Sequence, residues 1–520
     1  MFIMIPVSLQ LVFVCAVAYA LYRRLRSTGE QQCRPPGPPG YPIIGHLGLV
    51  PHKSPERAYM EWSRKYNSDL IHVKIFGQSI VVINSLEAAT EMLEKHGSIY
   101  SDRPAFSYFE TLGYHDHLTF MSSRDPMFAM HRRLVQNAFS KTASRKFTAI
   151  QENEARKLVR RILLDPKDWK RLMRLFSTAV IMQIMTGQEV RGPDDEYVRI
   201  AEDINNAISG GPPLGASGLD VFPWLKHLPS WCDPTGSTRY VRKWAHAIHD
   251  VQVVPYERVM KEIRAGNAKP SLVVDMVLKE EARVQRGEPP LLTPERIQGI
   301  IGAVYGAAQE TTADTLVVFT FAITMYPEVQ KKAKAELYAV LGSDRLPSLA
   351  DREHLPYIER VVQETFRFWP TIPLGVPRRA MEDDMYKNML LPKGSLILTN
   401  STAITHDERV YSQPWKFDPD RYLPKEQGGR GEPMTAPHFG FGRRICPGRF
   451  TGENSVFIAI ATMLHVLSFD KARDEEGNEI TVDAETTEYG GGLGSYPLHV
   501  PCDISAASAH AAELVAEYDA

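Results

Sequence analysis

Apolar residues recur with the period of amphipathic helices along most of the chain after residue 41. The clearest helix opens at Thr293, a favourable N-cap residue, with Pro294 in the first turn, and it runs to about Met325. It stops there because Pro327 cannot continue a helix. Further helices are predicted over residues 327–342, 356–368 and from just after Cys446 to about 467.

Strand-forming residues are confined to short stretches. Residues 70–84 predict a hairpin, because two β-rich runs flank Gly77–Gln78, and a further short strand is expected at 395–400. No repeat or internal linker is visible, so residues 41–502 are predicted to form one large, mainly α-helical body with small β-sheets. The alanine-rich tail, residues 503–520, leaves a frayed helix or disorder open.

The N-terminus has a different pattern. Residues 1–22 carry no charged side chain and contain eleven Ile, Leu, Val or Phe residues, enough to span a bilayer core of roughly 30 Å. Arg23, Arg24 and Arg26 follow, which predicts a transmembrane signal anchor with the body on the cytosolic side. A buried core helix is the alternative. Residues 23–40 form a basic, Pro/Gly-rich hinge whose Pro-Pro-Gly units cannot continue a helix.

Composition narrows the classes of function. The chain is 43% hydrophobic and 23% charged, with a formal net charge of −2, so nothing favours nucleic acid as a partner. The five cysteines form no C-x-x-C pair, which disfavours a zinc ribbon or an iron–sulfur cluster. Their odd number and wide spacing favour a reducing compartment.

One cysteine has an unusual setting, the stretch HFGFGRRICPGRF at 438–450. Cys446 precedes a predicted helix whose N-terminal amides favour a thiolate, and Arg444 could pair with a ligand carboxylate. Gly440, Gly442 and Gly448 would let a large flat ligand approach the backbone. An inert buried cysteine beside a glycine-rich turn is the alternative.

The same stretch matches F-x-x-G-x-R-x-C-x-G and resembles the haem-binding loop of the cytochrome P450 family. The resemblance implies the P450 fold and haem b as the cofactor. It also implies that the Cys446 thiolate is the axial ligand of the haem iron. The motif residues that it assigns to cofactor binding are Phe439, Gly442, Arg444, Cys446 and Gly448.

Three charged residues upstream fit a structural part of that family. Glu364 and Arg367 stand at i and i+3 on one predicted helix face, which alone is typical of an ordinary surface ion pair. Arg421, in PWKFDPDRYLP, stands where the family's P-x-x-F-x-P-x-R segment has its arginine. The resemblance implies that the three form a buried network that supports the haem loop.

The long predicted helix carries a stripe of small residues in GAVYGAAQETTADTL, which by itself is typical of close helix packing. The segment resembles the family's A-G-x-[DE]-T helix, which crosses the haem. It implies that Glu310 and Thr311 are the acid–alcohol pair that delivers protons to dioxygen. The sequence departs from the pattern at Ala308, where the family usually has glycine.

Two further arginines resemble residues that bind the haem propionates. Arg132, in FAMHRRL, matches the family's W-x-x-x-R helix, with Phe128 in the Trp position and His131 as a substitute donor. Arg378, in PLGVPRRA, stands where the family often has His or Arg. Solvated surface charge is the alternative for both arginines. Gly452 replaces a frequent alanine.

The resemblance implies a membrane-anchored, haem-dependent monooxygenase of the fungal microsomal type. It would sit in the endoplasmic reticulum membrane, use O2 on a small lipophilic substrate, and act in secondary metabolism such as terpenoid tailoring. Because the chain has no G-x-G-x-x-G fingerprint, electrons are expected from NADPH through a separate cytochrome P450 reductase, attracted by Arg443 and Arg449. The alternatives are a haem-thiolate isomerase or dehydratase that works without O2, and a non-catalytic haem-binding protein.

The sequence offers only broad candidates for the substrate pocket. They are residues 106–120, 371–376 and 489–493, which are aromatic, apolar or glycine-rich. In the family, a mobile roof over the substrate entrance occupies the region of Trp224, Leu225, Leu228 and Trp231. The sequence leaves two alternatives for these side chains, contact with the membrane or burial in the core.

Overall fold

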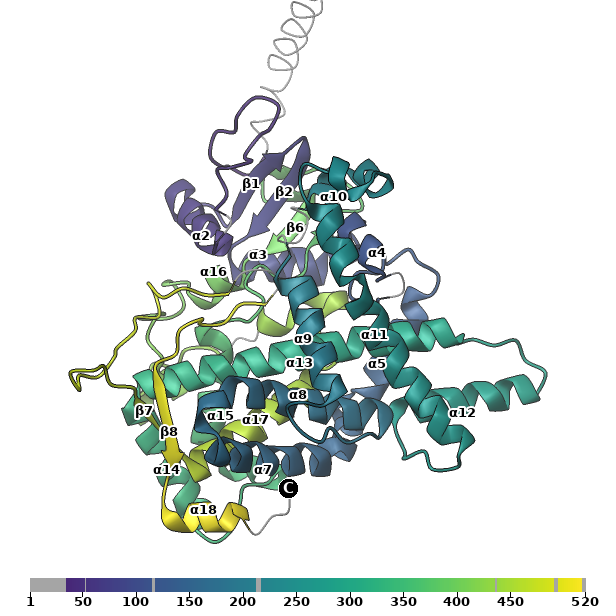
Figure 1. Ribbon diagram of the computed structural model, residues 1–520. Coiled ribbons are helices and arrows are strands. Elements are labelled where there is room, and N and C mark those ends of the chain that lie inside the picture. Colours follow the sequence, from purple (N-terminus) through teal and green to yellow (C-terminus); the bar gives the residue numbers. More distant parts are fainter. Residues whose placement is uncertain are drawn as a thin grey trace, which may run out of the picture.

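Helices form most of the molecule, and a small sheet lies at one end (Figure 1). The computed structural model describes residues 34–51, 53–114, 117–211, 217–434, 437–490 and 494–516. The helices are α2 (Pro55–Tyr66), α3 (Leu86–Thr90), α4 (Ser107–Leu112), α5 (Phe128–Ala138), α6 (Lys141–Ser144), α7 (Thr148–Leu164), α8 (Trp169–Thr186), α9 (Glu196–Ser209), α10 (Gly218–Val221), α11 (Ser237–Arg264), α12 (Leu272–Gln285), α13 (Pro294–Met325), α14 (Pro327–Leu341), α15 (Pro356–Phe368), α16 (Ser401–Thr405), α17 (Arg449–Val466) and α18 (Ala509–Ala516). The strands are β1 (Leu70–Ile75), β2 (Gln78–Ile83), β3 (Arg378–Arg379), β4 (Asp384–Tyr386), β5 (Met389–Leu391), β6 (Leu396–Thr399), β7 (Leu467–Lys471) and β8 (Cys502–Ala506).

Helix α13 runs through the middle of the molecule (Figure 1). Ile301, Leu316 and Phe319 are fully buried, because α8, α11 and α17 pack around the helix. The predicted helix is confirmed with the same limits, 294–325. Thr293 holds the N-cap position with extended backbone, although its side chain makes no capping bond to the helix.

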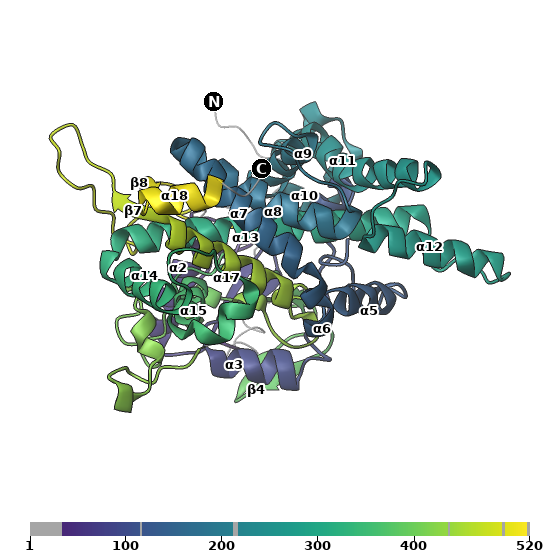
Figure 2. The same ribbon diagram turned by 90° about the horizontal axis from the view of Figure 1, so that it is seen from below.

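The other predicted helices are also present. Helix α14 ends at Leu341 because Gly342 takes a positive φ of 70° at the C-cap. Helix α15 has the predicted limits. Helix α17 begins at Arg449, three residues after Cys446, and lies between α13 and α15 (Figure 2). These helices form the core that holds the residues before α17 in place.

The principal sheet has four strands in the order β1-β2-β6-β3. The predicted hairpin is confirmed, with Leu70 opposite Ile83, but its turn is Phe76–Gly77 rather than Gly77–Gln78 because Gln78 pairs with Ile75. Strand β6, the predicted strand at 395–400, runs parallel to β2. Short β3 joins its other edge in antiparallel orientation, and this places Arg378 beside the core.

Residues 503–516, the described part of the predicted tail, pack on the helical body. Strand β8 pairs with β7 from Leu467–Ala506 to Lys471–Cys502. Helix α18 packs against α7 and α17, and its Leu514 and Val515 are buried. The described part of the tail is therefore a strand and a helix, because its apolar residues cover the end of the core.

The predicted anchor, residues 1–22, lies outside the described residues, as do residues 23–33 of the predicted hinge. In the ranges that are described, no helix combines the length and the apolar character needed to cross a bilayer.

Candidate active site

The loop before α17 is fixed by its own backbone. The Cys446 N–H donates to the Phe439 carbonyl at 2.8 Å, which closes the loop. Gly442 has a φ of 55°, and a Cβ atom there would lie 2.1 Å from the Leu93 carbonyl oxygen. Position 442 therefore requires glycine, because any side chain would push the loop off the segment after α3.

The Cys446 side chain lies on a cavity of about 300 Å³ between this loop and α13. Burial raises the pKa of the Cys446 thiol, while the Gly448 N–H and the charges of Arg132 and Arg449 act in the opposite direction. A Cβ atom at Gly448 would lie 3.9 Å from the sulfur, in ordinary contact. Coordination to a metal ion would favour the thiolate over the thiol, because the metal takes the place of the proton on the sulfur.

Four arginines surround the same cavity: Arg103, Arg132, Arg378 and Arg444. Three are buried, with 6%, 5% and 8% of Arg103, Arg378 and Arg444 exposed. Burial lowers the pKa of Arg444 to about 9 and that of Arg378 to about 10, and the neighbouring guanidinium groups lower both further. The structure therefore brings Arg132, Arg378 and Arg444 together on one cavity and adds Arg103.

These arginines donate to neutral acceptors. Arg444 donates to the carbonyls of Ser101 at 2.7 Å and Met121 at 2.8 Å, and Arg378 donates to that of Phe441 at 2.7 Å. Within the described residues none of the four forms an ion pair; the nearby Asp102 pairs with Arg379 instead. Three buried cations and a half-buried fourth without a counterion are costly, so the site fits a ligand that brings its own negative charges.

Thr311 and Glu310 lie on different faces of α13. Thr311 lines the cavity, and its hydroxyl donates to the Ala307 carbonyl at 2.8 Å. Glu310 does not line it, because consecutive helical residues point about 100° apart, and its carboxylate accepts a hydrogen bond from Ser209 of α9. The predicted pair is adjacent in sequence, but only the alcohol reaches the cavity.

The charged residues upstream meet in the interior. Glu364 accepts hydrogen bonds from Arg367 Nε at 2.7 Å and Arg421 Nε at 2.9 Å, and all three side chains are fully buried. Tyr422 donates to Glu364 at 2.8 Å, and Arg367 donates to the Thr405 carbonyl at 2.9 Å. The network thus joins α15 to the segment that leads into the Cys446 loop.

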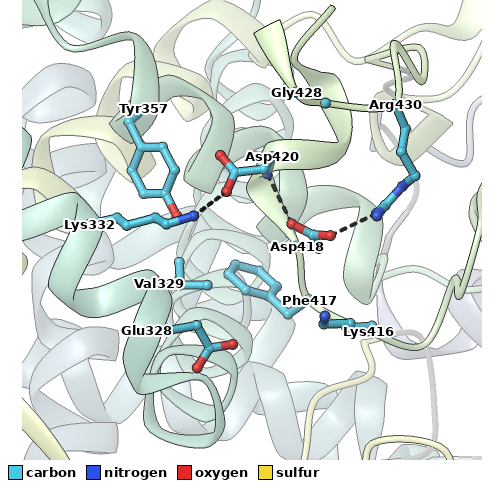
Figure 3. A pocket seen from close by; sticks show the side chains of 11 residues that line it. Glu328, Val329, Lys332, Tyr357, Lys416, Phe417, Asp418, Asp420, Gly428 and Arg430 are labelled. Atoms are coloured by element: carbon cyan, nitrogen blue, oxygen red, sulfur yellow. Dashed lines mark hydrogen bonds and ion pairs between the residues drawn. The ribbon is translucent and has the colours of Figure 1, made fainter. Parts of the chain in front are cut away.

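A second hollow, of about 270 Å³, lies on the molecular surface near this network (Figure 3). Lys332 pairs with Asp420 at 2.6 Å and Arg430 pairs with Asp418 at 2.8 Å across it. These carboxylates are already neutralised by partners within the hollow. We therefore place the chemistry in the cavity at Cys446.

Comparison with known proteins shows which family has this fold and this cavity. The family model described as Cytochrome P450 matches residues 35–486. The chain belongs to the cytochrome P450 family. Among similar proteins is cytochrome P450 monooxygenase 136 of Postia placenta, which is 31% identical over 99% of this chain and 96% of its own length. The cytochrome P450 monooxygenase ple1 of Rhodocybe pseudopiperita is 34% identical over 92% and 91% of the two chains.

This P450 is therefore a monooxygenase of the family to which these fungal proteins belong, and the family's cofactor is haem. The residues around the cavity fit that group. Cys446 supplies the thiol, and the unpaired arginines supply the positive charge that two propionates need. The glycines of the loop leave its backbone open to a flat ring.

The departures from the family pattern are accommodated locally. The Arg444 guanidinium lies 3.9 Å from the centre of the Phe128 ring, so the phenyl group packs on a cation where the family has an indole. His131 is fully buried and does not line the cavity, which argues against its substituting for the indole N–H. A Cβ atom at Gly452 would lie 3.8 Å from Phe439, so an alanine would fit equally well.

The predicted substrate segments contribute unequally. Leu118 and Thr119 line the cavity from the first segment, and Thr371, Ile372, Gly375 and Val376 line it from the second. Tyr489, in the third, stacks on Trp369 at 3.5 Å instead, and residues 491–493 lie outside the described chain. Of the roof residues, Leu225 is buried and Leu228 packs against the core, whereas Trp224 and Trp231 are 59% and 80% exposed.

Arg103 and Asp314 were not predicted from the sequence. Arg103 lies in the short stretch SDRP, and the fold brings it to the segment before Arg378, where it donates to the carbonyls of Val376 and Pro377. Asp314 is one helical turn beyond Glu310, and that spacing of four was the available signal.

Proposed function

We propose that this P450 inserts one atom of O2 into a small lipophilic molecule and reduces the other to water, with NADPH as the electron source. When bound, the haem iron supplies the oxygen-activating chemistry, and the Cys446 thiolate would hold it. Arg132, Arg378 and Arg444 would bind the propionates. Phe439, Gly442 and Gly448 would shape the loop beneath the ring.

The observation that carries the proposal is that Thr311 and Cys446 line the same cavity. A hydroxyl there can position a water molecule and pass protons toward the oxygen being reduced. Glu310, the neighbouring acid, would supply those protons from the other side of α13. A peroxide isomerase or dehydratase needs no such delivery, and a haem carrier needs none either.

Thr311→Ala tests this assignment. We expect NADPH consumption to continue while hydrogen peroxide replaces most of the oxygenated product, because proton delivery is lost but electron supply is not. Thr311→Ser is the matched control and should keep the coupling, since it retains the hydroxyl. Unchanged coupling in Thr311→Ala would contradict the role. Turnover without NADPH and reductase would favour the isomerase, and no substrate-dependent NADPH consumption would favour the haem carrier.

The cavity wall supports an apolar substrate of modest size. Val304 and Ala307 of α13, with Val180 and Ile181 of α8, give it an aliphatic lining. We expect a terpenoid or a similar secondary metabolite. A panel of such compounds, titrated into the ferric enzyme and followed by the shift of its Soret band, tests this class. Preference for charged, water-soluble compounds would exclude it.

The surface beside the Cys446 loop supports a reductase partner. Arg443 is exposed there, and exposed Arg133, Lys141, Arg145 and Lys146 extend the positive charge over α5, α6 and the turn that follows α6. No ion pair neutralises these five side chains within the described ranges. Arg449, also predicted to attract the partner, donates instead to the Cys446 carbonyl at 3.1 Å. We name the five exposed residues the basic face; it suits an acidic flavoprotein, an NADPH-dependent reductase.

We also propose attachment to the endoplasmic reticulum membrane through residues 1–22. Exposed aromatic side chains support a membrane-facing end of the molecule: Phe76, at the hairpin tip, and Trp224 both contact Phe222, with ring centres 5.4 Å and 6.3 Å away. Removal of residues 1–22 should release most of the enzyme from microsomes. Microsomes that retain the shortened enzyme undiminished would rule the anchor out.

A further inference from the structure

Two carboxyl side chains lie together on α13, on a face that does not line the cavity. Glu310 and Asp314 are one helical turn apart, so their side chains are neighbours. Glu310 is 7% exposed and Asp314 is 2% exposed. Both carboxyls approach Gly494: a Cβ atom built there would lie 2.9 Å from Asp314 Oδ2 and 3.1 Å from Glu310 Oε1. Two acidic oxygens therefore converge on one buried point.

The two carboxyls have unequal partners. Glu310 Oε1 accepts a hydrogen bond from the Ser209 hydroxyl, which favours the charged form of Glu310. Asp314 Oδ2 is buried and has no hydrogen-bond partner among the residues that the structure describes. A buried carboxylate oxygen without a donor is costly, whereas a protonated carboxyl is not.

The surroundings do not supply enough charge for two anions. Arg174 of α8 is the cation that acts on both carboxyls, yet it forms an ion pair with neither in the described chain. The other titratable groups facing the pair are neutral phenols, Tyr496 after Gly494 and Tyr114 after α4. Burial raises the pKa of both acids, and the charge of Glu310 raises that of Asp314 further.

We propose that Asp314 holds a proton in the resting enzyme and passes it to Glu310, so that Asp314 is a positioning residue for the proton supply of Thr311. In this step the O–H bond of Asp314 breaks, an O–H bond forms on Glu310, and the negative charge moves from Glu310 to Asp314. A side-chain rotation or one bridging water is enough to join two oxygens that converge on the same point. Solvent then returns a proton to Asp314.

This inference rests on the proposed role of Thr311 for its catalytic consequence, but the location of the proton is measurable without turnover. Infrared difference spectra of the ferric holoenzyme across pH resolve the carbonyl stretch of a protonated carboxyl. We expect such a band at neutral pH in the wild type, its loss in Asp314→Asn, and its retention in Glu310→Gln. Asp470→Asn, which changes an exposed acid on β7, is the matched control and should retain it.

Coupling supplies the second measurement. The amount of product formed per NADPH consumed should fall several-fold in Asp314→Asn at neutral pH. The absorption spectrum of the reduced variant with carbon monoxide should be that of the wild type, which shows that the haem site is intact. Because the pKa of Asp314 is raised, its proton is present below that pKa and is lost as the pH rises through it. Wild-type coupling should therefore decline at high pH, and coupling in Asp314→Asn should be low and flat.

Three results would overturn the inference: no carboxyl band in the wild type, a band that survives in Asp314→Asn, or an Asp314→Asn enzyme with the wild-type pH profile. Failure of the Thr311 role gives a different pattern. In that case Thr311→Ala stays coupled, while the infrared band still disappears in Asp314→Asn.

Discussion

At the scale of single residues, the unpaired charge around the cavity has the clearest consequence. Arg103, Arg378 and Arg444 donate hydrogen bonds to backbone carbonyls, which are neutral and cannot balance the positive charge of the guanidinium groups. The protein thus carries an electrostatic cost that a dianionic cofactor relieves. The cofactor should stabilise the fold for this reason as well as by filling the cavity.

Arg378→Leu tests this argument. We expect a loss of about 2 kcal/mol of haem binding, roughly thirtyfold, because one charged hydrogen-bond donor is removed. The melting temperature of the haem-free protein should not fall, since the variant also removes a repelling charge. Transfer of haem to apomyoglobin measures the first effect and calorimetry the second. Arg443→Leu changes an exposed arginine of the Cys446 loop and should retain haem normally; equal retention in both variants would contradict the argument.

The sequence predicted the cavity residues that belong to a long motif. Cys446 was found because its glycine and arginine neighbours leave few other interpretations. Arg103 was missed because it belongs to none of the motifs and is hundreds of residues away from Arg378 and Arg444, and only the fold shows that they are adjacent. Glu310 and Thr311 are adjacent in sequence and therefore lie on different faces of α13, which a linear motif does not reveal.

At the scale of elements, the buried network ties α15 to the segment before the Cys446 loop. Glu364→Gln should destabilise the protein by about 3–5 kcal/mol, because it leaves Arg367 and Arg421 buried without their shared anion. Unfolding in guanidinium chloride, followed by far-ultraviolet circular dichroism, measures this loss. Lys332→Ala removes the exposed partner of Asp420 nearby and should cost less than about 1 kcal/mol. If both variants lost a similar amount of unfolding free energy, the buried network would stabilise the protein no more than an exposed ion pair does.

The elements were the most predictable level. Helices α13 and α15 have the expected limits because proline marks both of their boundaries. The hairpin turn was displaced by one residue because its register depends on strand pairing, which a single sequence does not reveal. Strand β8 was missed because its partner in the described sheet is β7, which is 31 positions away in sequence at the nearest pair, Lys471–Cys502.

At the scale of the whole molecule, the basic face is the feature that points to a partner. The triple variant Lys141→Glu, Arg145→Glu and Lys146→Glu should raise the reductase concentration needed for half-maximal turnover about tenfold at low salt, with less effect at high salt. The absorption spectrum of the reduced triple variant with carbon monoxide should be the same as that of the wild type. Lys279→Glu, on the exposed side of α12, is the control. If both variants need the same reductase concentration for half-maximal turnover, the reductase does not dock on the basic face.

The central claim is that the Cys446 sulfur binds the haem iron as a thiolate. The absorption spectrum of the reduced enzyme with carbon monoxide tests it most directly, because a thiolate ligand displaces the Soret band strongly to longer wavelength. We predict that band in the wild type and in Cys232→Ser, whose cysteine is exposed, and its loss in Cys446→Ser. A Cys446→Ser enzyme that kept the band, or a wild-type protein with no Soret band after reconstitution with hemin, would contradict the account.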